Sequence, residues 1–241
     1  MIKLNINAKT REFDYRIRAT PVKIDWEDAL WHKIRYILIN DTILKNDPRK
    51  LLDIGCGKGI IEYLLPENIF CLGCDIVEEV IESARLLNQF KKNRQFLVCD
   101  IEKTSLAYGK FDVIVISEVL EHLANDEKML EKARGLLKDE GILIITVPNS
   151  KRLVNRLAGL FGLSRFQDES HMREYTLHEI EALLNRCRFE TQNAMGICLQ
   201  LPKEKYLPKN FRFIMSFFVD NVVAKKLPFL ANSILLVAKK C

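Results

Sequence analysis

A glycine-rich turn between an apolar strand and a helix constrains this chain more than any other feature. Residues 51–59 read LLDIGCGKG, in which Asp53 is followed by three glycines, Gly55, Gly57 and Gly59. Glycine has no Cβ, so it permits a tight turn and a close approach of a ligand to the backbone. The helix expected next presents free N–H groups at its positive end, which suits a carboxylate or a phosphate. The sequence therefore predicts a strand, a ligand-binding turn and a helix in succession.

Apolar runs alternate with helical patterns along most of the chain, which is typical of a parallel sheet covered by helices. The expected strands are Lys50–Ile54, Ile69–Cys74, Gln95–Cys99, Asp112–Ser117, Gly141–Val147, Glu190–Ala194 and Ser233–Lys239. The expected helices are Ile60–Leu65, Val77–Phe90, Asp126–Lys138 and Leu177–Cys187, the last with a capping box from Thr176 to Glu179. We therefore predict the α/β class, with a Rossmann-like, doubly wound, seven-stranded sheet.

Three segments lie outside this alternation, and we expect them to decorate a single domain over residues 1–241. Residues 1–48, with the amphipathic stretch Trp26–Asn40, are predicted to form a helical cap. Residues 49–195 and 233–240 form the core, within which Pro148–Ser170 carries an apolar stripe at helical spacing. Residues 196–232 form an insert rich in phenylalanine (Phe211, Phe213, Phe217, Phe218 and Phe229). Such inserts either build a substrate pocket or simply pack on the core.

Composition excludes several classes of protein. The apolar runs are too short to cross a bilayer, and the first residues lack the apolar core of a signal peptide, so we expect a cytoplasmic location. Seven cysteines form no framework, and Cys71-x-x-Cys74 has no second pair for a zinc site, so we expect free thiols. The segment from Gly196 to Cys241 holds eight basic and two acidic residues. This excess suggests an anionic substrate, a peripheral membrane contact or merely a solvated lysine-rich face.

The residues around the turn discriminate between ligands. A nicotinamide fingerprint needs glycine where Ile60 stands, and the spacing of a P-loop is also absent. Asp75 ends the second strand 22 residues after Asp53, where a carboxylate can accept both hydroxyls of a ribose. The turn, this aspartate and residues 112–123 (DVIVISEVLEHL) together resemble the class I S-adenosylmethionine-dependent methyltransferases. The resemblance covers roughly residues 30–195 and the last strand, which it implies to be antiparallel.

The resemblance implies a set of cofactor contacts. Asp75 and Ile76 would lie at the ribose, and Asp100 with the Ile101 backbone would lie at the adenine. The remaining implied contacts lie near the methionine moiety: Arg35, Asp53, Gly55, Gly57 and the carbonyl of Ser117. Binding of S-adenosylmethionine is therefore expected at the ends of the first four strands.

A cluster of acids and histidines follows the fourth strand. Glu118, Glu121 and His122 have i, i+3, i+4 spacing, which would place all three on one face of a helical turn, and His171 comes 49 residues after His122. This pattern is similar to the site of quinone-biosynthesis O-methyltransferases and small-RNA 2′-O-methyltransferases, which implies a Mg²⁺ ion held by these four residues. Such an ion lowers the pKa of an acceptor hydroxyl. If this chain binds no metal, His122 or His171 would serve as the catalytic base.

These observations favour a methyltransferase acting on an oxygen of a small-molecule or lipid- or sugar-linked acceptor. The phenylalanine-rich insert suggests an amphiphilic acceptor, and no RNA-binding module or arginine-rich tract indicates a nucleic acid. The alternatives are a non-catalytic S-adenosylmethionine-binding protein, an RNA 2′-O-methyltransferase and a nucleotide-dependent oxidoreductase, the last weakened by Ile60. The acceptor pocket would be formed by residues 1–48, 148–170 and 196–232.

Overall fold

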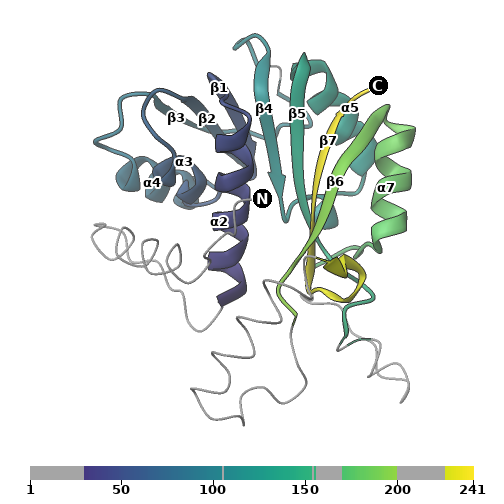
Figure 1. The fold of residues 1–241 in the computed structure, drawn as a ribbon. Coiled ribbons are helices and arrows are strands. Elements are labelled where there is room, and N and C mark those ends of the chain that lie inside the picture. The colour runs from purple at the N-terminus through teal and green to yellow at the C-terminus, as the bar shows by residue number, and fades with distance from the viewer. Residues whose placement is uncertain (1–29, 105, 154, 156–169, 200–225) are drawn as a thin grey trace, which may run out of the picture.

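The computed structural model describes residues 30–104, 106–153, 155, 170–199 and 226–241 (Figure 1). Several sequence predictions fall outside these ranges. They are most of the helical cap over residues 1–48, most of the stripe within Pro148–Ser170, and most of the insert 196–232 with four of its five phenylalanines. The described residues comprise the sheet, the helices that cover it and the loops at the strand ends.

A seven-stranded mixed sheet forms the centre of the described chain, in the order β3-β2-β1-β4-β5-β7-β6. Its strands are β1 (Lys50–Ile54), β2 (Phe70–Asp75), β3 (Arg94–Val98), β4 (Phe111–Ser117), β5 (Leu137–Pro148), β6 (Phe189–Ile197) and β7 (Ser233–Lys240). The pairs among β1 to β5 are parallel, whereas β7 runs antiparallel to both β5 and β6. The predicted seven-stranded sheet with an antiparallel last strand is thus confirmed.

Helices cover both faces of the sheet (Figure 1). The longer helices are α2 (Leu30–Lys45), α3 (Ile60–Leu64), α4 (Glu78–Leu87), α5 (Asp126–Leu136) and α7 (Leu177–Arg186). Strand residues alternate between two apolar clusters: Leu51 packs with α2 and α3, whereas its neighbour Leu52 packs with α5 and α7. Cys71 and Cys74 fall in opposite clusters and all seven cysteines are free thiols, as the sequence predicted. No helix among the described residues is long and apolar enough to cross a membrane.

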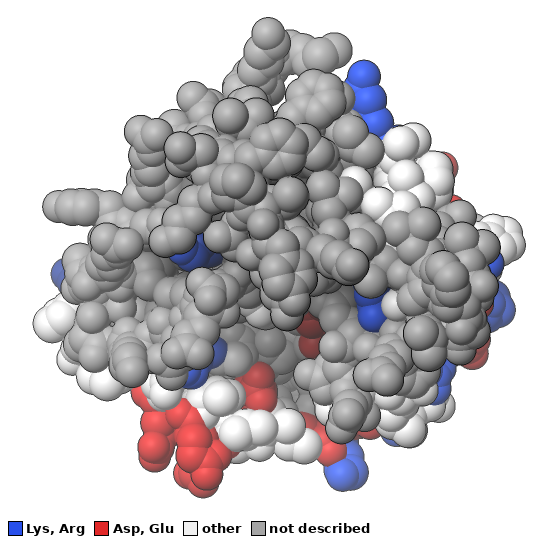
Figure 2. Space-filling view, turned by 90° about the horizontal axis from the view of Figure 1, so that it is seen from below, with Lys and Arg blue, Asp and Glu red and all other residues white. Residues whose placement is uncertain are grey.

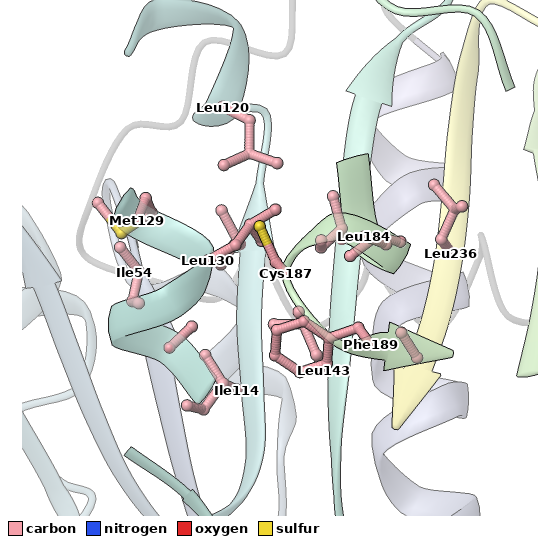
Figure 3. Packing of buried hydrophobic residues seen from close by; sticks show 14 of the residues in the cluster. Ile54, Ile114, Leu120, Met129, Leu130, Leu143, Leu184, Cys187, Phe189 and Leu236 are labelled. Atoms are coloured by element: carbon pink, nitrogen blue, oxygen red, sulfur yellow. The ribbon is translucent and has the colours of Figure 1, made fainter. Parts of the chain in front are cut away.

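The cluster on the α5 and α7 face supports the loop that follows β4 (Figure 3). Leu120, in the short 3-10 helix η1 (Leu120–His122), is fully buried in the same cluster as Met129 and Leu130 of α5 and Leu184 of α7. A fully buried leucine contributes about 1.5–3 kcal/mol relative to an exposed one. The loop that carries the acids and histidines is therefore fixed to the core.

The boundary between α5 and β5 differs from the sequence prediction. The helix expected over Asp126–Lys138 ends at Leu136, and the strand expected from Gly141 begins at Leu137. Leu137 has an extended backbone, is fully buried and pairs with Phe111 across the sheet. Burial and strand pairing of this leucine override the helical pattern. The capping box at the start of α7 is confirmed, since Thr176 and Glu179 exchange both hydrogen bonds.

The strand order reverses between β1 and β4, because β1 leads to β2 on one side and has β4 on the other. In open α/β sheets, ligands bind in the crevice at the carboxyl ends of strands where the order reverses. Figure 2 looks at the molecule from this end, and acidic side chains of the described residues gather along one margin of the view.

Candidate active site at the carboxyl ends of the strands

The glycine turn is held by backbone hydrogen bonds to the neighbouring strand. The N–H groups of Gly55 and Cys56 both donate to the carbonyl of Cys74, at 2.8 and 3.1 Å. Gly55 and Gly57 have φ angles of +74° and +51°, which residues with a Cβ rarely adopt. A Cβ on Gly55 would lie 2.3 Å from Val119, whereas a Cβ on Gly57 would meet nothing within 4 Å. Gly55 therefore permits close packing, and Gly57 leaves open space beside the backbone.

Asp75 joins the glycine turn to the end of β2. Its Oδ2 accepts a hydrogen bond of 3.0 Å from the N–H of Gly57, and its Oδ1 accepts one of 3.0 Å from Val77. Each carboxylate oxygen has a further lone pair and can still accept from a ligand hydroxyl. The carboxylate is thus fixed by backbone at the edge of the open space.

A cavity of about 390 Å³ opens at this point. It is lined from four successive strand ends, those of β1, β2, β3 and β4. Five of the residues implied as cofactor contacts line it: Gly55, Asp75, Ile76, Asp100 and Ile101. The strand ends therefore converge on a shared crevice, which is the arrangement that the cofactor hypothesis requires.

Four of the implied cofactor residues do not line the cavity. Gly57 borders it through its contact with Asp75, and the hydroxyl of Ser117 pairs with that of Thr146 at 2.9 Å. Arg35 and Asp53 are buried behind the lining. Arg35, Asp53 and Ser117 thus lie outside the lining of the cavity, and their contacts with a cofactor stay predictions.

Asp53 forms a buried carboxyl pair with Glu62 of α3. Both side chains are almost completely buried. Burial raises the pKa of both groups, that of Glu62 to about 7, and the neighbouring charge of Glu62 raises that of Asp53 further. Burial and mutual repulsion therefore favour the protonated form of a carboxyl group at the base of the glycine turn, a feature that the sequence prediction did not include.

Asp100 caps a turn as well as lining the cavity. Its Oδ1 accepts from the N–H of Glu102 at 3.0 Å, and its Oδ2 pairs with the Lys103 ammonium at 2.8 Å. The hydrogen bond from Lys103 lowers the pKa of this carboxyl group. The carboxylate is therefore ionised and can accept a hydrogen bond from a donor such as an amino group.

Glu118 departs from the predicted metal set. Its Oε2 lies 3.5 Å from Nη1 of Arg35, and it lines the cavity. The backbone of Glu118 has a φ angle of +55°, which is uncommon for a residue with a side chain and turns the chain sharply after β4. Because of this turn, the i, i+3, i+4 helical face expected for Glu118, Glu121 and His122 does not form, and Glu118 stands apart from the other three candidate ligands.

The remaining three candidate ligands gather in one place. One ligand atom each from Glu121, His122 and His171 lie within 4.8 Å of one another. The two imidazole rings are 5.0 Å apart and meet edge to face. His122 also lines the cavity, so this acid–histidine cluster borders the space in which the cofactor would lie.

Glu121 is the buried member of the acid–histidine cluster. Its side chain is fully buried, and neither carboxylate oxygen has a hydrogen-bond partner among the described residues. Burial, followed by the negative charge of Glu118, raises the pKa of Glu121 to about 9. A buried carboxyl group without partners is costly unless a cation or a proton satisfies it. This group is therefore suited to hold a cation.

Each histidine of the cluster directs Nδ1 toward an oxygen. His122 Nδ1 is 3.4 Å from the carbonyl of Ser170, and His171 Nδ1 is 3.3 Å from Oε1 of Glu174. A carbonyl or ionised carboxylate oxygen accepts, so these contacts favour the tautomer in which Nδ1 carries the proton. Both Nε2 atoms then offer a lone pair, and the acid–histidine cluster presents electron-pair donors.

Sequence reasoning missed most of the apolar part of the cavity. The additional lining residues are Ile54, Cys74, Cys99, Glu102, Val119, Leu123 and Met129. Cys99 immediately precedes Asp100, so its position after the third strand was the only available signal. Met129 belongs to α5, and nothing local to its sequence points to the cavity.

The fold and site together define a doubly wound α/β protein with a ligand cavity at the carboxyl ends of its strands. A model of the methyltransferase domain family matches residues 45–193, which is more than half of the chain. The chain belongs to this family, which confirms the methyltransferase resemblance.

Similar proteins are found among curated proteins and among solved structures. The mitochondrial ubiquinone biosynthesis O-methyltransferase of Rattus norvegicus is 34% identical over 149 residues, which are 54% of this chain and 42% of that protein. The ubiquinone biosynthesis O-methyltransferase of Glaesserella parasuis is 30% identical over 130 residues, or 50% of this chain and 54% of that protein. The chain thus spans about half the length of these relatives.

Among solved structures, the magnesium protoporphyrin IX methyltransferase of Synechocystis with bound SAH has a TM-score of 0.64 and 15% identity, and the match covers 99% of this chain and 98% of that one. The small RNA methyltransferase HEN1 has a TM-score of 0.65 and 16% identity, over 91% of this chain and 26% of that one. These structures share the fold.

Proposed function

We propose that this chain is an S-adenosylmethionine-dependent methyltransferase. The observation that carries the proposal is the convergence of a glycine turn and the carboxylates of Asp75 and Asp100 on one cavity. Asp75 would accept the ribose hydroxyls beside Ile76, and Asp100 with Ile101 would bind the adenine. The part of the cavity beside Gly55 and the open space at Gly57 would admit the methionine end, with the Ser117 carbonyl, Arg35 and Asp53 beyond it.

Methyl transfer from a sulfonium is an in-line displacement, in which a nucleophile attacks the methyl carbon as the C–S bond breaks. The thioether leaves as a neutral group, so the protein mainly has to align the nucleophile and remove its proton. Alignment contributes on the order of 7–11 kcal/mol in the best intramolecular cases. We assign proton removal to His122 or His171, whose Nε2 atoms would accept the proton in the Nδ1–H tautomer.

The acceptor is proposed to be an oxygen of a small or amphiphilic molecule. Two observations support this choice: the acid–histidine cluster at the cavity suits a hydroxyl that must lose a proton, and the curated relatives are named as ubiquinone biosynthesis O-methyltransferases. A non-catalytic S-adenosylmethionine-binding role and methylation of an RNA 2′-hydroxyl are the competing functions. They are separated by the acceptor assay below.

The acid–histidine cluster also fits a divalent cation. Glu121 has two buried oxygens without a hydrogen-bond partner among the described residues, and the two histidines offer Nε2 lone pairs. We therefore propose that Glu121, His122 and His171 hold the Mg²⁺ ion that the sequence resemblance implies, with Glu118 outside the set. A bound cation lowers the pKa of an acceptor hydroxyl. Two imidazoles make the set richer in nitrogen than Mg²⁺ prefers, so Mn²⁺ belongs in the same test.

The test is calorimetric titration with S-adenosylmethionine, S-adenosylhomocysteine and NADH, followed by transfer of a labelled methyl group to phenols, catechols, lipid-linked quinols and a short RNA. We expect the first two ligands to bind, NADH to fail, and a phenolic acceptor to be methylated. Binding of NADH alone contradicts the proposal, and cofactor binding without any turnover favours the non-catalytic role.

Activity should fall in EDTA and return with Mg²⁺ or Mn²⁺, and Glu121→Ala should abolish this response. Indifference to EDTA leaves the histidines as bases only.

A further inference from the structure

The segment that carries His171 lies beside η1 and is fixed there by contacts of the residues that follow the histidine. The N–H of Met172 donates to the carbonyl of Glu121 at 2.9 Å. Arg173 and the Tyr175 hydroxyl both bind Oδ2 of Asp126, at 2.8 and 2.7 Å. The backbone of this segment therefore has a fixed position relative to Glu121.

Within this segment, Glu174 connects His171 to an arginine that lies after β5. Oε1 of Glu174 lies 3.3 Å from Nδ1 of His171, and Oε2 lies 2.6 Å from Nη1 of Arg152. The same nitrogen of Arg152 donates to the carbonyl of Asn149 at 3.2 Å. The Glu174 side chain is 0% exposed, and those of His171 and Arg152 are each 7% exposed. The contact is thus made away from solvent, where pairing is strong and loss of a partner is costly.

The chemistry of these three groups fixes the direction of each hydrogen bond. Arginine can only donate, so Arg152 requires an acceptor and keeps one oxygen of Glu174 in that role. The other oxygen of an ionised carboxylate also accepts, so the proton of the neutral imidazole must reside on Nδ1. Nε2 of His171 is then unprotonated on the side of the ring away from Glu174.

We propose that Glu174, oriented by Arg152, is a positioning residue that holds His171 in the Nδ1–H form and so presents Nε2 to Glu121 and His122 as an electron-pair donor. The inference rests on the proposed function, in which Nε2 either ligates the cation or accepts the acceptor's proton. Groups that orient a ligating histidine commonly change metal affinity by 10–100-fold when they are removed.

Glu174→Gln is the most informative substitution, because it preserves the shape of the side chain but replaces one accepting oxygen with a donating NH₂ group. Arg152 would still need an acceptor, so the amide oxygen of glutamine should turn to it. The amide NH₂ would then face His171, and Nδ1 would have to accept instead of donate. The proton should therefore move to Nε2, and the lone pair offered to the acid–histidine cluster would be lost.

The first measurement is the tautomer of His171, read from ¹⁵N-histidine NMR at a pH about two units above the usual imidazole pKa. The signal is assigned from its disappearance in His171→Gln. We expect the Nδ1–H form in the wild type and the Nε2–H form in Glu174→Gln. An Nε2–H form in the wild type overturns the proposal, and it does so without requiring any variant to fold.

The second measurement is Mn²⁺ affinity by electron paramagnetic resonance. We expect the dissociation constant to rise about 10–100-fold in Glu174→Gln. Glu127→Gln is the matched control, since it removes the acidic partner of a solvent-exposed glutamate–arginine pair with Arg186, and it should change nothing. An unchanged tautomer together with an unchanged Mn²⁺ affinity in Glu174→Gln overturns the proposal.

The proposed function can be tested independently of the role of Glu174. S-adenosylhomocysteine should bind the wild type and Glu174→Gln equally, and its failure to bind the wild type contradicts the methyltransferase proposal. If the wild type does not bind Mn²⁺, the cation site is wrong, and the tautomer alone then decides the role of Glu174.

Discussion

The two halves of the cavity are built by different means. The first half, at the ends of β1 to β3, is assembled from backbone: glycine N–H groups donate to the carbonyl of Cys74 and to Asp75. The second half, at η1, is assembled from residues far apart in the sequence, such as Tyr175 on Asp126 and His171 beside Glu121. A backbone-built half needs glycine and one acid at fixed spacing, whereas the other half exists only once the sheet has formed.

The halves meet closely between Gly55 and Val119. A Cβ on Gly55 would approach the Val119 side chain to 2.3 Å, and the φ of +74° adds backbone strain. Gly55→Ala should therefore push the halves apart, which is the largest effect we expect. Overpacking and a strained left-handed backbone together cost roughly 2–5 kcal/mol. The free energy of unfolding and the affinity for S-adenosylhomocysteine should both fall.

Two other glycines provide controls for this substitution. Gly57→Ala has a positive φ but no clash, so its cost should be about 1–2 kcal/mol from the backbone alone. Gly135→Ala, within α5 and free of any neighbour within 4 Å, should stabilise by up to about 1 kcal/mol. If Gly55→Ala behaves like Gly135→Ala in chemical denaturation, the two halves are not in contact as described.

The carboxyl pair beneath the first half gives a pH-dependent prediction. Burial raises the pKa of Glu62 from 4.5 to about 7, so the folded state holds a proton that the unfolded state releases above about pH 4.5. A raised acid pKa means that the stability contributed by this group falls as pH rises from about 4.5 to about 7. Glu62→Gln should remove this loss, and it should stabilise the protein by about 1–3 kcal/mol at pH 8 relative to its effect at pH 4.

The measurement is denaturant unfolding of wild type and Glu62→Gln across this pH range. Glu127→Gln, at an exposed ion pair, is the control and should leave the pH dependence unchanged. Parallel stability curves for wild type and Glu62→Gln would mean that the buried pair is ionised in the folded protein.

Asp75 tests whether the first half binds the ligand by itself. Asp75→Ala removes a carboxylate that holds two backbone N–H groups and lines the cavity, so S-adenosylhomocysteine should bind about 1–3 kcal/mol more weakly. Asp112→Ala is a matched control, because Asp112 also accepts from two N–H groups, at Arg49 and Lys50, but lies at the start of β4. Calorimetry should show an unchanged ligand affinity for Asp112→Ala. Equal affinity in Asp75→Ala would place the ligand elsewhere.

The smallest effect is expected at the helix that follows the second half. Thr176→Ala removes the cap of α7, which should cost about 1 kcal/mol of stability. Ligand affinity should be unchanged, because the cap lies outside the cavity lining. A loss of affinity for S-adenosylhomocysteine in this variant would show that the second half moves as one unit with α7.

The contrast between the halves also explains what the sequence could reveal. The strands, the glycine turn and the acids at successive strand ends are local patterns, and the sheet and the cavity position follow from them. The helical face expected for Glu118, Glu121 and His122 was wrong, because the left-handed backbone of Glu118 interrupts the helical spacing. Helical spacing in a sequence does not reveal a sharp backbone turn at a single residue such as Glu118.

Long-range pairs were invisible for a different reason. Glu174 and Arg152 have no pattern that links them, since their contact depends on the loop after β5 meeting the segment before α7. The Asp53–Glu62 pair was likewise missed, because a helix residue three positions into α3 gives no sign that it lies beneath the turn. Such contacts are set by tertiary packing, which a single sequence does not display.

The most direct test of the central claim is a crystal structure with S-adenosylhomocysteine. We expect the ligand in the strand-end cavity, with its ribose hydroxyls on the carboxylate of Asp75, its adenine beside Asp100, and its sulfur facing His122. Density for the ligand at any other place, or an adenosine turned away from Asp75, would show that the proposed cofactor site is wrong.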